Sequence, residues 1–260
     1  MRQEITSRKN PIIKNAAALA GSAEKRKETG LFLCEGARLC YDAAVSDVSV
    51  KIVFATETDL QKYAEYIQTI EEQAGEFYLI PDSVASLLSQ TKNTQGVFCV
   101  CSAPSFESES LDGKMLVLEN IQDPANLGTI LRTAEAFGVN QVVLLGSRQD
   151  PCSPKVLRAS MGAVFRQHII MAEDVSVFFT ELENMHIETY AAIPVPEGIL
   201  LGQCEFPENA AVFIGNEGNG LEEETIQKCR KKLTIPMRGR AESLNAAAAA
   251  SILLWELTKK

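Results

Sequence analysis

Short apolar runs alternate with amphipathic segments along most of the chain. Apolar, partly β-branched runs such as 50–55 and 141–145 predict buried strands, and longer segments with helical spacing predict helices. We expect strands at 31–34, 50–55, 76–80, 96–101, 114–118, 141–145, 168–171, 187–192, 210–214 and 233–235. We expect helices from Asn10-Pro11 to Gly21 and at 37–45, 59–72, 82–89, 127–137, 154–165, 175–185, 222–231 and 244–259. This order predicts an α/β fold, a mostly parallel sheet with helices on both faces.

One polar segment interrupts the alternation. Residues 103–113 are acidic and contain Pro104 and Gly113, a composition typical of linkers. We therefore expect a smaller α/β domain at 1–103, a linker at 104–112 and a second domain at 113–260.

The charge balance argues against indiscriminate nucleic-acid binding, because the formal net charge is −9. Local clusters nevertheless carry positive charge, at the N-terminus and within 151–168 and 228–240. Solvated helix ends are one interpretation of these clusters, and phosphate binding is the other. The N-terminal candidates for phosphate binding are Arg8, Lys9, Lys14, Lys25, Arg26 and Lys27.

Several classes of protein are disfavoured. No run approaches the roughly 18 apolar residues of a membrane span, and the weakly apolar stretch 16–20 leads directly into basic residues. We therefore expect a cytoplasmic protein without membrane association. The seven scattered cysteines contain no CxxC pair and predict reduced thiols. The only histidines are His168 and His186, so we expect no metal site.

Three predicted strand ends are followed by unusual turns, where ligands bind in parallel sheets. In the first, residues 119–138, Asn126 is a candidate helix cap and Gly128 permits close approach. Arg132 lies four residues after Gly128, on the same helix face. An arginine at the edge of an apolar face, with only its charged end in solvent, is the alternative interpretation.

The second turn, residues 213–221, contains Gly215, Gly218 and Gly220 around Glu217. It lacks the dinucleotide-binding GxGxxG spacing. The third turn, 235–245, ends at Ser243 and Asn245, either of which would cap the next helix. An ordinary glycine-rich loop and simple capping are the alternatives. Together the three turns predict one composite pocket without a metal.

The three segments resemble the three motifs of the SpoU (TrmH-type) branch of the SPOUT methyltransferases. They read NIQDPANLGTILRTA (120–134), IGNEGNGL (214–221) and IPMRGRAESLNAA (235–247). The resemblance covers residues 114–260, including DPCSPKVLRASMGA (150–163). The first domain, with SRKNPIIK (7–14) and GLFLCEG (30–36), resembles the RNA substrate-binding domain of these enzymes, which is similar to a ribosomal-protein RNA-binding fold.

The resemblance implies transfer of a methyl group from S-adenosylmethionine (SAM) to a ribose 2′-hydroxyl of RNA. It also implies a C-terminal trefoil knot and a homodimer formed through the second domain. The implied SAM-binding residues are Gly215, Asn216, Gly218, Ile235, Met237 and Leu244. Arg132 matches the catalytic arginine, which serves a pocket completed by the partner subunit. Asn126, Glu217, Ser243 and Asn245 match residues expected to hold Arg132, the ribose or the nucleotide.

Alternatives remain open at this level. Ribosomal RNA is the expected substrate, by analogy with family members that carry an added N-terminal domain, and transfer RNA is the alternative. A non-catalytic RNA-binding protein on the same fold is another alternative. A phosphotransferase is disfavoured by the absence of a P-loop motif. The chain departs from many relatives at 246–250, where five alanines replace valines and serine, so helix packing at the dimer interface could differ.

Overall fold

The chain folds into two compact units, described by a computed structural model that covers residues 2–107, 110–147 and 149–259. The first unit comprises Met1–Ser105 with Asp150–Arg166, and the second comprises Phe106–Gln149 with Gln167–Lys260. The segment Asp150–Arg166 thus packs with the first unit, although it lies between two strands of the second in sequence. Residues 108 and 109 of the expected linker lie outside the described residues.

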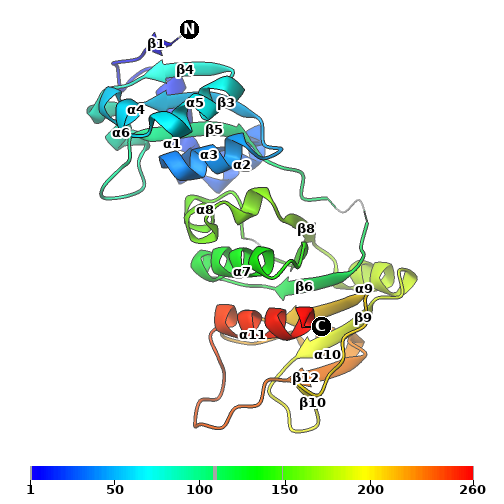
Figure 1. Ribbon diagram of the computed structural model, residues 1–260. Coiled ribbons are helices and arrows are strands. Elements are labelled where there is room, and N and C mark those ends of the chain that lie inside the picture. The colour runs from blue at the N-terminus through cyan, green and yellow to red at the C-terminus, as the bar shows by residue number, and fades with distance from the viewer. Residues whose placement is uncertain (1, 108–109, 148, 260) are drawn as a thin grey trace. The chain divides into compact units, whose positions relative to one another are not determined.

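The first unit contains a five-stranded sheet in the order β1-β4-β3-β5-β2 (Figure 1). Its strands are β1 (Gln3–Glu4), β2 (Leu31–Glu35), β3 (Val50–Ala55), β4 (Glu76–Leu79) and β5 (Val97–Ser102). Its helices are α1 (Pro11–Gly21), α2 (Ala23–Thr29), α3 (Ala37–Ala44), α4 (Glu57–Lys62), α5 (Ala64–Gln73), α6 (Asp82–Leu88), α8 (Pro154–Ser160) and the 3-10 turn η1 (Ala163–Phe165). Strand β5 runs antiparallel to both β3 and β2, while β1, β4 and β3 are parallel.

In the core of the first unit, helices α1 and α6 bury Ile13 and Leu88 in a cluster that includes Phe98 of β5.

Residues 150–166, which follow β7, also contribute to the core of the first unit. The ring of Phe165, at the end of η1, stacks on Phe32 of β2 with centroids 5.9 Å apart. The segment is therefore held by core packing as well as by polar contacts.

The second unit contains a seven-stranded sheet in the order β10-β12-β9-β11-β6-β7-β8, with every described pairing parallel. Its strands are β6 (Lys114–Glu119), β7 (Gln141–Leu145), β8 (His168–Ala172), β9 (Glu188–Ala192), β10 (Ile199–Leu200), β11 (Ala210–Ile214) and β12 (Lys231–Thr234). Its helices are α7 (Pro124–Ala136), α9 (Val175–Asn184), α10 (Glu223–Lys228) and α11 (Ala246–Thr258). Met115 and Val117 of β6 pack in a cluster with α9, and α7 packs against α11. The expected sheet with helices on both faces is confirmed for this unit.

Two expected helices are interrupted. The segment 59–72 forms α4 and α5, with a break at Tyr63. The segment 154–165 breaks after α8, where Met161 and Gly162 both have positive φ, at 50° and 80°. A helix cannot continue through two left-handed residues, and the periodicity of apolar positions does not reveal such a break.

The caps also differ from expectation at one functional turn. Asp123, not Asn126, caps α7 by accepting a hydrogen bond from the backbone N–H of Ala125 at 2.8 Å. Asn126 lies in the first turn, so its side chain is free for other contacts. Asn245 caps α11, as one of the two alternatives predicted. Among residues 2–107, 110–147 and 149–259, no helix is long and apolar enough to cross a membrane.

Candidate active site

The three turns singled out from the sequence meet in the second unit, beyond the carboxyl ends of β6 and β11. The Nδ2 of Asn126, at the start of α7, donates to Glu217 Oε1 at 2.7 Å. The Nδ2 of Asn245, at the start of α11, donates to Asn126 Oδ1 at 3.1 Å. Parallel strands bring their exits to one edge of the sheet, which is why residues far apart in sequence join here.

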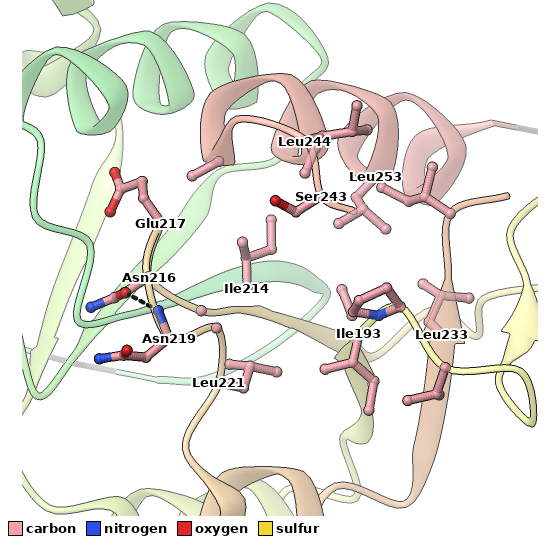
Figure 2. A pocket seen from close by; sticks show the side chains of 18 of the residues that line it. Ile193, Ile214, Asn216, Glu217, Asn219, Leu221, Leu233, Ser243, Leu244 and Leu253 are labelled. Atoms are coloured by element: carbon pink, nitrogen blue, oxygen red, sulfur yellow. Dashed lines mark hydrogen bonds between the residues drawn. The ribbon is translucent and has the colours of Figure 1, made fainter. Parts of the chain in front are cut away.

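A cavity of about 470 Å³ lies beside this cluster (Figure 2). All six residues expected to bind a cofactor line it: Gly215, Asn216, Gly218, Ile235, Met237 and Leu244. Glu217 and Ser243 also line it, whereas Asn126, Arg132 and Asn245 do not. Most of the remaining lining is apolar, including Ile214, Leu221 and Leu233, so the cavity offers an apolar floor with a polar rim.

Sequence reasoning missed one wall of the cavity. The segment 192–195, Ala-Ile-Pro-Val, begins at the last residue of β9 and contributes four lining residues. Strand β9 lies next to β11, so its exit is at the same edge of the sheet. The strand was predicted, but the apolar turn after it contains no glycine cluster or charged residue to single it out.

Gly215 is required by a close approach of the backbone. A Cβ at this position would lie 1.9 Å from the carbonyl carbon of Gly220 and 2.1 Å from the backbone nitrogen of Leu221. The turn is closed by paired backbone hydrogen bonds between Asn216 and Gly220, each 3.0 Å. Asn216 Oδ1 also accepts from the backbone N–H of Gly218 at 2.7 Å. The glycines therefore form a tight turn that borders the cavity.

Glu217 is ionised in this arrangement. Burial raises the pKa of its carboxyl, but hydrogen bonds from Asn126 and from backbone N–H groups, including that of Gln122, lower it more. The net effect is a pKa below the usual value. The Gln122 N–H donates to Oε2 at 3.2 Å, so both carboxylate oxygens accept hydrogen bonds from neutral groups.

A second carboxylate, that of Glu119, links two segments that border the site. Glu119, at the end of β6, is buried and accepts hydrogen bonds from the backbone N–H of Glu222 at 2.8 Å and from the Thr225 hydroxyl. Burial raises the pKa of this carboxyl. The contacts tie the exit of β6 to the start of α10, which follows the glycine-rich turn.

Arg132 lies away from this network. It is exposed on α7, and within the described residues it has no hydrogen bond or ion pair. It lies six positions after Asn126, about 9 Å along the helix axis. The expectation that Asn126 and Glu217 hold Arg132 is not met within one chain, because these two side chains bind each other.

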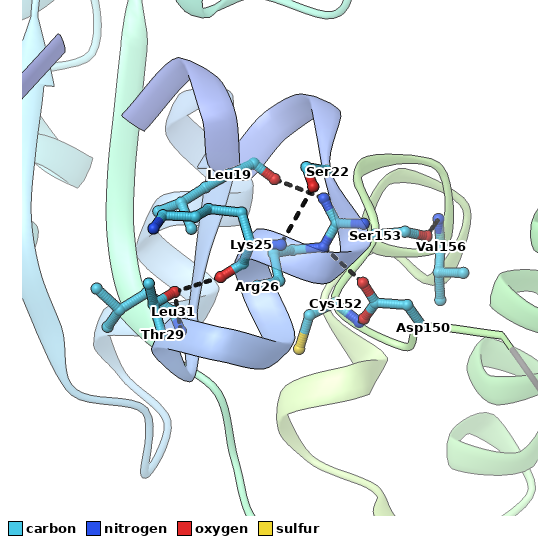
Figure 3. A network of polar contacts seen from close by, with 10 residues as sticks. All are labelled: Leu19, Ser22, Lys25, Arg26, Thr29, Leu31, Asp150, Cys152, Ser153 and Val156. Carbon is cyan, nitrogen blue, oxygen red and sulfur yellow. Dashed lines mark hydrogen bonds and ion pairs between the residues drawn. The ribbon is translucent and has the colours of Figure 1, made fainter. Parts of the chain in front are cut away.

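The basic N-terminal residues divide into two groups. Arg8, Lys9, Lys14 and Lys27 are exposed, and Lys25 is half-buried beside Glu28, with Nζ 2.9 Å from Oε2. Arg26 is buried, with Nε 2.5 Å from Asp150 Oδ2, and it also donates to the Leu19 carbonyl (Figure 3). The expectation that Arg26 binds RNA is therefore corrected, because its guanidinium is engaged within the folded unit.

Two further features bear on the chemistry. Within the described residues, no group of three or more histidine, cysteine, aspartate or glutamate side chains is arranged to hold a metal ion. All seven cysteines are free thiols, and six of them are buried. Burial raises the pKa of thiols such as Cys229, to about 12, so this thiol stays protonated at neutral pH.

The fold and the site define an α/β protein with a ligand-sized cavity beyond the carboxyl ends of parallel strands. The model of the SpoU rRNA Methylase family matches residues 113–255, and that of the MRM3-like substrate binding domain matches residues 10–99. The chain belongs to the SpoU rRNA methylase family.

Individual relatives agree over nearly the whole chain. The 23S rRNA (guanosine(2553)-2′-O)-methyltransferase RlmP of Bacillus subtilis is 32% identical, over 98% of this chain and 99% of the relative. The 23S rRNA (uridine(2479)-2′-O)-methyltransferase of Streptomyces viridochromogenes is 27% identical, over 99% and 92%. The crystal structure of AdoMet-bound rRNA methyltransferase from Sinorhizobium meliloti superimposes with a TM-score of 0.87 at 28% identity, covering 98% of this chain and 97% of that one.

Proposed function

We propose that the chain transfers the methyl group of SAM to a ribose 2′-hydroxyl of RNA, and that ribosomal RNA is its substrate. Family membership makes it a SAM-dependent RNA methyltransferase. The observation that carries the proposal is the cluster of Asn126, Glu217 and Asn245, which reaches the cavity through Glu217. The relatives' names support ribosomal RNA as the substrate. They specify different nucleotides, so the nucleotide does not follow from similarity.

The cavity fits the proposed cofactor by size and chemistry. Its volume of about 470 Å³ lies within the roughly 300–1,000 Å³ of small-molecule sites. The apolar lining suits the adenine ring, and the backbone groups of the turn from Gly215 to Gly220 suit the polar edges of the ligand. The ionised Glu217 lends negative potential to a site for a sulfonium cation. When bound, SAM would supply an electrophilic methyl carbon.

The chain's own residues would align the nucleophile. An in-line displacement needs the ribose oxygen positioned opposite the leaving sulfur, with water excluded. We assign Arg132 to the phosphate next to the reacting ribose and to polarisation of its hydroxyl, because an arginine side chain stays protonated in proteins and is a poor base. The proton would leave through phosphate or water. Asn126, Glu217, Ser243 and Asn245 would contact the ribose or nucleotide from the rim.

The first unit would bind the RNA. Residues 1–103 would form the substrate-binding domain, 104–112 a linker and 113–260 the catalytic domain, of which residues 150–166 pack with the first unit. The substrate-binding family model over residues 10–99 supports this division. The exposed Arg8, Lys9, Lys14 and Lys27, with Lys25, would contact phosphates.

The quaternary structure and the knot are part of the same proposal. Trp255 and Ile252 on α11 are 59% and 40% exposed, an apolar surface that a second copy of the chain would cover. The partner would then complete the pocket that Arg132 serves. The knotted C-terminus is proposed from the resemblance to the family, and the contact of Asn245 with Asn126 places the segment after β12 against the exit of β6. Cytoplasmic location would follow from a ribosomal substrate.

The decisive test is transfer of labelled methyl from SAM to ribosomal RNA that lacks the host's own modification. We expect label on a ribose, reduced about 100-fold or more in Arg132→Ala, since loss of one donor that stabilises charge in the transition state costs about that much. Lys228→Ala, which removes one exposed positive charge on α10, is the matched control and should retain activity. A folded protein that binds SAM and methylates neither ribosomal nor transfer RNA would favour the non-catalytic alternative.

A further inference from the structure

The exit of β7 contributes a side chain to the site that no sequence motif singled out. Gln149 Nε2 lies 2.5 Å from the backbone carbonyl oxygen of Gln122, in the turn after β6. Because a carbonyl oxygen only accepts, the amide nitrogen must be the donor. Strands β6 and β7 are neighbours in the parallel sheet, so their exits lie side by side.

The peptide group that Gln149 contacts also faces Glu217. The backbone N–H of Gln122 donates to Glu217 Oε2 at 3.2 Å. The N–H of Asp123 belongs to the same peptide group as the Gln122 carbonyl, and it helps to lower the pKa of Glu217. A hydrogen bond accepted by a peptide carbonyl polarises that group and strengthens its N–H as a donor. Gln149 thus acts on both the position and the polarity of the turn that holds Glu217.

We propose that Gln149 is a positioning residue of the methyl-transfer site. It holds the Gln122–Asp123 peptide so that Glu217 and, through it, Asn126 keep the orientation needed for transfer. Gln149 itself lies outside the cavity lining, so it touches neither the cofactor site nor its apolar floor. This inference rests on the proposed methyl transfer for its kinetic consequence, but its structural consequence for Glu217 is independent of any activity.

The test compares two substitutions in the full-length protein. Gln149→Met keeps nearly the same shape and removes the donor without adding charge, while Gln149→Lys keeps an N–H donor of similar reach. Gln227→Met is the matched control, because Gln227 donates to Glu223 on the exposed face of α10, at 2.9 Å. Methyl transfer to ribosomal RNA, the Kd for SAM and the melting temperature are measured for all three.

We expect kcat of Gln149→Met to fall about tenfold, the factor that corresponds to loss of about one hydrogen bond of support. The Kd for SAM should stay within about twofold and the melting temperature close to that of the native protein. Gln149→Lys should keep most of the activity, which a loss of packing alone would not explain. Equal kcat for Gln149→Met and Gln227→Met would overturn the inference.

A second readout separates this inference from the proposed function. Carbon-13 NMR of the glutamate carboxyls, with Glu217 assigned by its absence in Glu217→Gln, gives the Glu217 pKa directly. Gln149→Met should raise that pKa, because the carboxylate loses hydrogen-bond support, and Gln227→Met should not. If the native protein transfers no methyl group, the proposed function fails while this measurement still decides the role of Gln149. An unchanged Glu217 pKa in Gln149→Met contradicts that role, whatever the activity.

Discussion

The buried ion pair of Arg26 offers a sharp test of how the first unit is held together. The Arg26 side chain is 8% exposed and that of Asp150 is 24% exposed. The guanidinium also donates to the Leu19 carbonyl, at the end of the preceding helix. Replacing Arg26 with methionine keeps much of the apolar stem but leaves the Asp150 carboxylate without its charged partner.

The size of the effect follows from this geometry. Removing one partner of a buried ion pair costs about 3–5 kcal/mol, because the other charge stays buried and uncompensated. The residual exposure of Asp150 lets water compensate in part, so we expect about 3 kcal/mol for Arg26→Met. A protein of this size loses roughly 2–4 °C of melting temperature per kcal/mol, which gives a fall of about 6–12 °C.

Calorimetry or circular dichroism measures this fall, and Lys27→Met is the matched control. Lys27 is the next residue on α2 and is exposed, so the same change of charge should alter stability by less than about 0.5 kcal/mol. The double variant Arg26→Met, Asp150→Asn should recover part of the loss. RNA affinity should fall in Lys27→Met. The reasoning is refuted if Arg26→Met melts like the native protein and loses RNA affinity as Lys27→Met does.

Two further predictions concern the second unit. Gly215→Ala should abolish measurable SAM binding, because its Cβ would overlap the backbone of Gly220, whereas Gly218→Ala should cost only a few-fold, since its Cβ meets one side-chain atom at 3.5 Å. Titration calorimetry on both variants decides this, and equal affinities would contradict the packing argument. Trp255→Glu should yield monomers by analytical ultracentrifugation, because it places a charge in the proposed dimer surface beside Ile252; a persistent dimer would locate the interface elsewhere.

The sheet of the second unit was the most predictable part of the fold. Strands 141–145 and 210–214 have the bounds that the sequence predicts, because strands buried on both faces are continuous apolar runs. The meeting of the three turns also follows from elementary geometry, since neighbouring parallel strands end at one edge. The sequence pattern does not show which side chains form hydrogen bonds with each other, such as Asn126 with Glu217.

Other features depend on contacts that no local pattern encodes. Arg26 belongs to a basic run with Lys25 and Lys27, and only the fold shows that Asp150, 124 residues away, neutralises it. The segment 150–166 has an ordinary helical pattern, which does not specify the unit whose core it joins. Its helix breaks at Met161, a residue other than glycine with a left-handed backbone conformation. Intrinsic propensity disfavours this conformation, so the surrounding structure must impose it.

The hydrogen bonds of Glu217 also bear on an arginine that, in the proposed dimer, serves a pocket completed by the partner subunit. A lone carboxylate near a guanidinium would pair with it and cancel the positive charge needed for an RNA phosphate. Here Asn126 donates a hydrogen bond to Oε1 of Glu217 and the Gln122 N–H donates to Oε2, so neutral donors bind both carboxylate oxygens. Arg132, exposed and unpaired among the described residues, keeps all its N–H groups for an anion. In the proposed dimer, where Arg132 serves a pocket completed by the partner subunit, loosening the Gln122 turn would therefore free a carboxylate oxygen of Glu217 to compete with phosphate for that arginine.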